Sequence, residues 1–146
     1  MGDLVRRVGR CTIAPGGRPY RYLMRSVLYQ QLATAAAAKI EQRVRALGSG
    51  QIPAAKRIPN ISDAAFREAG LSRQKIAAFR SIADAFASGR VRPDALPRMS
   101  NEEVQVCVTE IHGVGEWTAH MLLMFSLGRR DILPVGDYGV QKAAQN

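Results

Sequence analysis

Hydrophobic residues recur along this chain with the three- and four-residue spacing of amphipathic helices. One long apolar stripe runs from Tyr22 to Leu47, and a second occupies residues 76–86. Alternating β-branched residues never continue long enough to build a sheet. The pattern therefore predicts an all-α fold.

Capping residues mark where the predicted helices begin and end. The segment Tyr22–Leu47 is closed by Gly48-Ser49-Gly50 and is expected to hold two helices or one bent helix. Two shorter helices follow, each opened by a serine and closed by a glycine: Ser62 to Gly70 and Ser72 to Gly89. Proline-containing connectors are predicted at residues 51–60 and 90–98.

The last third of the chain predicts a pair of helices joined by a tight turn. Ser100-Asn101-Glu102-Glu103 has the sequence of a capping box, so a helix is expected from there to about Glu110. A strongly apolar helix is expected over Glu116–Leu127, ended by Gly128. Between the two lies Gly113-Val114-Gly115.

Length and composition limit the architecture. With 146 residues, 47% of them hydrophobic, the chain fits one ordinary domain or two small helical lobes that share an interface. No apolar run approaches the roughly eighteen residues that a membrane helix needs, and residues 1–7 lack an apolar signal core. We expect a cytoplasmic protein without membrane contact, associated with the nucleoid if the source is bacterial.

The net charge of +9 lies entirely in the first part of the chain. Residues 1–59 carry eleven Lys and Arg against Asp3 and Glu41, whereas residues 60–146 carry ten of each sign. Such an asymmetry is typical of a polyanion binder, because basic side chains that reach phosphates release condensed counterions. A solvated arginine-rich surface, or one that binds acidic proteins or anionic lipid, would have the same composition.

The two cysteines, Cys11 and Cys107, lie far apart in sequence and lack the spacing of a zinc or iron–sulfur site. Both are expected to be reduced and structural. No redox cofactor is implied.

The turn at Gly113-Val114-Gly115 carries the first chemical indication. Both glycines are expected to adopt backbone angles closed to other residues, with no side chain between backbone and ligand. Amide N–H groups at the start of the following helix can then bind a phosphate oxygen. Carbonyls on the other side of the turn can hold a monovalent cation, although a Gly-Val-Gly turn also occurs between helices without binding phosphate.

The segment Ile111–Ala119 resembles the helix-hairpin-helix of the DNA glycosylase superfamily (HhH-GPD) that includes endonuclease III. The tryptophan in Gly-Glu-Trp-Thr-Ala is similar to that of the 3-methyladenine DNA glycosylase II branch. The resemblance covers about residues 18–142, with further matches at Arg25–Leu32, Ala69–Lys75 and Leu133–Tyr138. It implies a single glycosylase domain over residues 1–146, built from two small helical lobes.

The resemblance assigns the catalytic carboxylate to Asp137. From the residues alone, without the hairpin, a structural N-cap for the helix that begins at Tyr138 is the favoured interpretation of Asp137. As the catalytic group it would stabilise the positive charge that develops on the sugar when an N-glycosidic bond breaks. Trp117 occupies the place of the nucleophilic lysine of bifunctional relatives, and none of the lysines stands there: Lys39, Lys56, Lys75 and Lys142. A monofunctional enzyme without lyase activity is therefore expected.

The resemblance also implies how DNA would be held. The base pocket is expected to be formed by Trp117, Tyr138, Met121 and Tyr29, with Gln31 as the wedge that fills the space of a flipped base. Phosphate binding is expected at Gly113, Gly115 and Thr118, and a structural Na⁺ or K⁺ at the carbonyls of Thr109, Ile111 and Val114. The expected partner is double-stranded DNA with alkylated purines of the 3-methyladenine and 7-methylguanine type, with no obligate protein partner and no other cofactor.

Two departures from the family pattern keep alternatives open. His120-Met121 stands where relatives have an aromatic residue one turn after the tryptophan. The chain also ends nine residues after Asp137, where relatives continue with further helices, so the C-terminal part of the fold is expected to be short. The alternatives are a non-catalytic helix-hairpin-helix DNA-binding protein and an inactive, truncated glycosylase.

Overall fold

The computed structural model describes residues 6, 7, 9 and 16–144. These residues form helices, turns and loops, with no β-strand among them, as the sequence predicts. In chain order the elements are α2 (Pro19–Tyr29), α3 (Thr34–Leu47), η1 (Ala55–Asn60), α4 (Asp63–Glu68), α5 (Arg73–Ala87), η2 (Leu96–Arg98), α6 (Asn101–Thr109), α7 (Glu116–Phe125) and α8 (Tyr138–Ala144).

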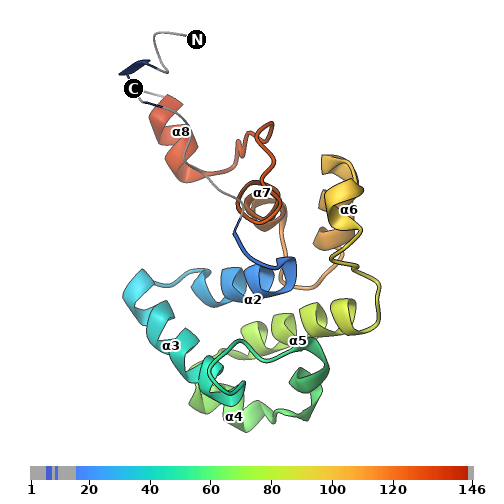
Figure 1. Ribbon diagram of the computed structural model, residues 1–146. Coiled ribbons are helices and arrows are strands. Elements are labelled where there is room, and N and C mark those ends of the chain that lie inside the picture. The colour runs from blue at the N-terminus through green and yellow to red at the C-terminus, as the bar shows by residue number, and fades with distance from the viewer. Residues whose placement is uncertain (1–5, 8, 10–15, 145–146) are drawn as a thin grey trace.

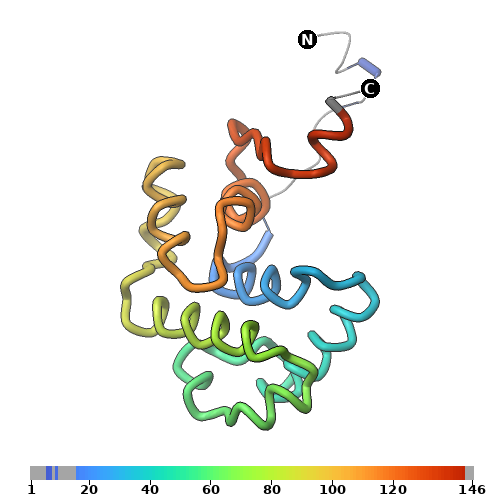
Figure 2. The backbone as a smooth tube through the Cα atoms, turned by 180° about the vertical axis from the view of Figure 1, so that it is seen from behind, coloured from blue at the N-terminus to red at the C-terminus, as the bar shows by residue number. Residues whose placement is uncertain are grey.

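Helix α2 lies between two groups of elements (Figure 1). On one side are α3, η1, α4 and α5, and on the other are α6, α7 and α8; the view from behind shows the same division (Figure 2). Helix α2 packs against α3, α5 and α7, so it links the two lobes. The predicted all-α fold with two helical lobes is confirmed.

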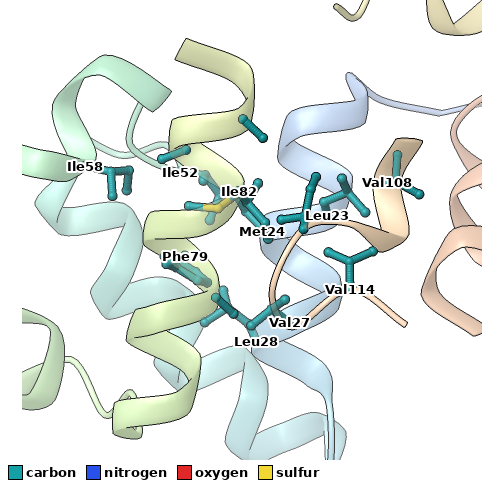
Figure 3. Close-up of a cluster of buried hydrophobic side chains, with 14 of the residues drawn as sticks. Leu23, Met24, Val27, Leu28, Ile52, Ile58, Phe79, Ile82, Val108 and Val114 are labelled. Carbon is teal, nitrogen blue, oxygen red and sulfur yellow. The ribbon is translucent and has the colours of Figure 1, made fainter. Parts of the chain in front are cut away.

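One hydrophobic cluster extends through both lobes. Leu23, Met24, Val27 and Leu28 form the buried face of α2, and they meet the α5 side chains and Val114 of the hairpin (Figure 3). Each fully buried side chain of this size stabilises the fold by about 1.5–3 kcal/mol. The hairpin is therefore anchored on the same core that positions α2.

Most predicted helix boundaries are confirmed. Ser62 and Ser72 accept the expected capping hydrogen bonds, and Ser100 forms a complete capping box with Glu103. The stripe over Tyr22–Leu47 is two helices, separated by a loop at residues 30–33.

Other boundaries differ from the sequence prediction. Helix α7 ends at Phe125, two residues early, and both proline-containing connectors include a short 3₁₀ helix. No helix in the described part of the chain is both long and apolar enough to cross a bilayer. Cys107 is a free, half-buried thiol, and Cys11 lies outside the described residues.

Candidate active site

A cavity of about 560 Å³ lies between one face of α2 and the start of α7. Four α2 residues at helical spacing form one wall, the following loop adds two glutamines, and a single α7 residue stands opposite: Tyr22, Arg25, Ser26, Tyr29, Gln30, Gln31 and Trp117. Its size and its apolar, aromatic lining suit a planar ligand held by a few polar groups.

The indole of Trp117 connects this cavity to Asp137. Trp117 is 44% exposed, and its Nε1 donates a hydrogen bond of 2.8 Å to Oδ2 of Asp137. The other carboxylate oxygen, Oδ1, accepts from the backbone N–H of Val140 at 3.1 Å in the first turn of α8. Asp137 therefore caps α8 and also contacts Trp117 in the cavity wall. A structural N-cap and a carboxylate beside the site are thus compatible interpretations of this residue.

Hydrogen bonds stabilise the ionised form of the Asp137 carboxylate. The bond from the Trp117 indole, followed by the backbone N–H of Val140, lowers the pKa of Asp137 below its ordinary value. Hydrogen bonds to the charged form have this effect because protonation would remove an acceptor. A negative charge is therefore fixed beside the cavity at neutral pH.

The two glycines of the hairpin have different roles. Gly113 has φ +87°, and a Cβ at this position would collide with the Cβ of Ala78 on α5. Gly115 is the N-cap of α7 with an ordinary φ of −94°, and a Cβ there would point into open space. The expectation of unusual backbone angles at both glycines was wrong for Gly115, which instead leaves the first amides of α7 uncovered.

Gln30 joins the loop after α2 to the hairpin. Its Nε2 donates to the carbonyl of Gly113 at 3.2 Å and to Oγ1 of Thr118 at 3.4 Å. Because the Thr118 side chain is buried and faces Gln30, a phosphate contact by this residue would use its backbone amide. Phosphate binding by Gly113, Gly115 and Thr118 stays a prediction.

Lys75 holds the same end of this loop, at its junction with α2. Its Nζ donates to the carbonyls of Leu28 at 2.7 Å and Gln30 at 3.0 Å, where α2 ends. The next residue, Gln31, is exposed and has φ +56°, a conformation that is costly for a residue other than glycine. The predicted wedge therefore lies at the cavity, on a strained backbone that α5 and the hairpin support.

The structure brings together only some of the predicted pocket residues. Trp117, Tyr29 and Gln31 line the cavity, but Tyr138 is 75% exposed and Met121 is buried in α7, and neither belongs to its lining. Sequence reasoning missed Tyr22, Arg25, Ser26 and Gln30, although the first three share the helix face of Tyr29 and could have been found from that spacing.

The predicted cation at the carbonyls of Thr109, Ile111 and Val114 stays a prediction. The Ile111 carbonyl already accepts the N–H of Val114 at 3.0 Å, which uses one of its two lone pairs. Within the described residues, His, Cys, Asp and Glu side chains form no group that could hold a metal ion.

Comparison with known proteins identifies the family that shares this architecture. The family model of the HhH-GPD superfamily base excision DNA repair protein matches residues 24–146. DNA-3-methyladenine glycosylase 1 of Schizosaccharomyces pombe is 38% identical over 125 residues, which are 84% of this chain and 55% of that protein. The chain therefore spans little more than half the length of this relative.

Solved structures agree with this assignment. The S. pombe 3-methyladenine DNA glycosylase in complex with abasic DNA has a TM-score of 0.84 at 35% identity, covering 99% of this chain and 72% of that one. A DNA-3-methyladenine glycosidase from Bacillus halodurans has a TM-score of 0.93 at 35% identity, covering 99% of this chain and 66% of that one. The fold, the hairpin and these matches establish that the chain belongs to the HhH-GPD superfamily of base excision DNA repair proteins.

Proposed function

We propose that this protein is a monofunctional DNA glycosylase that hydrolyses the N-glycosidic bond of alkylated purines in double-stranded DNA. The observation that carries the proposal is the Asp137 carboxylate, held 2.8 Å from the indole nitrogen of Trp117 beside a cavity that suits a purine. The names of the relatives from S. pombe and B. halodurans support the alkylated substrate class.

In the proposed reaction, the damaged base leaves the duplex and enters the cavity between Tyr29 and Trp117. A purine nucleotide alkylated at N3 or N7 carries positive charge on the base, which favours contact with aromatic faces and makes the base a good leaving group. The glycosidic bond breaks and the base departs with the electron pair. The ionised Asp137 stabilises the resulting positive charge on the sugar. Water then attacks the sugar carbon that carried the base and releases a proton to solvent, which leaves the abasic sugar.

The positions of the lysines support water as the nucleophile. Trp117 stands at the place of the nucleophilic lysine of bifunctional relatives. Burial lowers the pKa of Lys75, which would favour a nucleophilic amine. However, its Nζ donates to two carbonyls at the end of α2 and acts there as a helix cap. The abasic strand is expected to remain uncut.

The hairpin and the loop at residues 30–33 would hold the DNA during this reaction. Uncovered amides at the start of α7 suit a phosphate, and Gln31 suits the space that the extruded base leaves. Because Gln30 links these two elements by hydrogen bonds, phosphate binding and base extrusion would be aligned with each other.

The substitution Asp137→Asn tests the proposal. We expect the release of 3-methyladenine and 7-methylguanine from methylated duplex DNA to fall by at least about a hundredfold, because the variant lacks the charge that stabilises the transition state. DNA affinity should be retained or increased. The measurement is chromatography of the released free bases, together with fluorescence anisotropy of labelled duplex.

Asp131→Asn is the matched control, because Asp131 is an exposed carboxylate whose partner is the side chain of Asn101. It should release bases at the wild-type rate. Borohydride added during turnover should trap no covalent adduct between protein and DNA. A wild-type protein that binds DNA without releasing any base would instead be a non-catalytic DNA-binding protein.

A further inference from the structure

A buried carboxylate stands behind the α2 wall of the cavity. The side chain of Glu41 on α3 is only 7% exposed, and both of its oxygens accept hydrogen bonds. Oε1 accepts from Nε and Nη2 of Arg45 at 3.0 and 2.6 Å. Oε2 accepts from Nε of Arg25 at 3.1 Å and from the phenol of Tyr29 at 2.8 Å.

Two of these three partners face the cavity. Arg25 and Tyr29 both line it, and they are four residues apart on α2, with the guanidinium 4.9 Å from the centre of the Tyr29 ring. Glu41 does not belong to the lining and reaches the cavity only through them. It therefore fixes the position of a cationic and an aromatic group on the wall opposite Trp117.

The charges in this arrangement affect which bases the cavity can accept. The proposed substrate is a cationic base, yet Arg25 brings a positive charge to the wall that would contact it. The Arg25 side chain is 60% exposed, and a base in the cavity would displace water from it, so an unpaired guanidinium would then repel a cationic base. Glu41 supplies the compensating negative charge at hydrogen-bond distance from Arg25.

We propose that Glu41 is a positioning residue that sets the charge of the cavity wall through Arg25 and thereby allows cationic bases to enter. The inference rests on the proposed function, because it takes the cavity as the site of the extruded base. Glu41 suits this role since it is ionised. Burial raises the pKa of Glu41, but the hydrogen bonds from Tyr29, Arg45 and Arg25 outweigh burial and leave that pKa below its ordinary value.

Two substitutions with opposite effects on charge test the proposal. Glu41→Gln makes the wall more positive, and Arg25→Gln makes it more negative. We expect the release of cationic 7-methylguanine, relative to neutral hypoxanthine, to fall roughly three- to tenfold in Glu41→Gln and to rise by a similar factor in Arg25→Gln. The double variant should return the ratio toward the wild-type value.

Purely structural damage to the cavity wall would change the release ratio in a different way. Both single variants weaken the same ion pair between Arg25 and Glu41, so loosening of the wall alone would move the ratio in one direction in both. Such a result, or a ratio that neither variant changes, overturns the proposal. Asp84→Asn, which removes an exposed ion pair with Arg90, is the control that should leave the ratio unchanged.

A binding measurement separates this inference from the proposed catalytic function. Trp117 is the only tryptophan of the chain and lines the cavity, so its fluorescence reports occupancy directly. The probes are 7-methylguanosine, cationic in mildly acidic buffer, and neutral guanosine. Opposite shifts of their affinity ratio in the two variants support the proposal even if no base is released, in which case only the glycosylase function fails. The proposal is overturned if the affinity ratio shifts in the same direction in both variants, or if neither nucleoside quenches the fluorescence of Trp117.

Discussion

At the scale of single residues, the Asp137 carboxylate accepts two hydrogen bonds, one from the indole of Trp117 and one from the backbone N–H of Val140. The family resemblance implies a catalytic role for Asp137 and places Trp117 where bifunctional relatives carry a lysine. It does not predict that the indole donates to the carboxylate. That contact depends on the path of the loop between α7 and α8, which local capping and periodicity do not determine. The same limit explains why Tyr138 was expected in the pocket although its side chain is exposed.

Trp117→Phe should change the pH dependence of base release. The indole hydrogen bond is the main cause of the lowered pKa of Asp137, so its loss raises that pKa toward the ordinary value. The ionised form, which the proposed mechanism requires, is lost as pH falls through this pKa. The acid limb of the single-turnover rate profile is therefore expected at higher pH in the variant than in the wild type.

The phenylalanine retains an aromatic wall, which separates loss of the hydrogen bond from loss of the ring. Asp131→Asn should leave the acid limb in place. A Trp117→Phe profile that is lower at every pH but has an unmoved acid limb would show that the indole does not control the ionisation of Asp137.

At the scale of elements, the predictable features are those fixed by neighbouring residues. Serine caps and the capping box depend on contacts within four residues, and the structure confirms them. The position of the hairpin is predicted correctly, but backbone angles explain only part of the need for glycine at position 113. The close approach of Gly113 to Ala78 joins segments far apart in the sequence, which local patterns do not reveal. Gly115 has no such packing constraint.

Gly113→Ala and Gly115→Ala should therefore separate folding from DNA binding. At Gly113 the added methyl group collides with Ala78, and the alanine must adopt a left-handed backbone conformation. Together these effects should lower the free energy of unfolding by about 2–5 kcal/mol. At Gly115 the methyl group meets open space, so stability should change little while DNA affinity falls. Urea unfolding and anisotropy with labelled duplex measure the two effects.

Adding Ala78→Gly to Gly113→Ala removes the collision but not the backbone strain, so it should recover part of the lost stability. Equal destabilisation by the two hairpin substitutions would contradict the division of roles between these glycines.

At the scale of the whole molecule, the charge asymmetry is real but not all of it is available for DNA. Arg25 and Arg45 belong to the basic first part of the sequence and are half or more exposed, yet both pair with the buried Glu41, which offsets part of their charge. Helices α2 and α3 each carry one pair of residues with i, i+4 spacing in the sequence. On α2 the pair is Arg25 with Tyr29, and on α3 it is Glu41 with Arg45. The meeting of the two pairs requires the packing of α2 against α3, which periodicity alone does not predict.

The remaining basic excess predicts a strong salt dependence of DNA binding. The logarithm of the affinity of Asp137→Asn for unmodified duplex should fall linearly with the logarithm of salt concentration, by about 0.9 for each phosphate that Lys or Arg neutralises. Adding Gly115→Ala should lower the affinity at every salt concentration but leave the slope unchanged, because a backbone amide releases no counterion by charge neutralisation. Competition distinguishes DNA from other polyanions: excess duplex should displace the labelled DNA, and vesicles of anionic lipid should not. Binding that is insensitive to salt, or displaced only by the vesicles, would show that the basic surface serves another ligand.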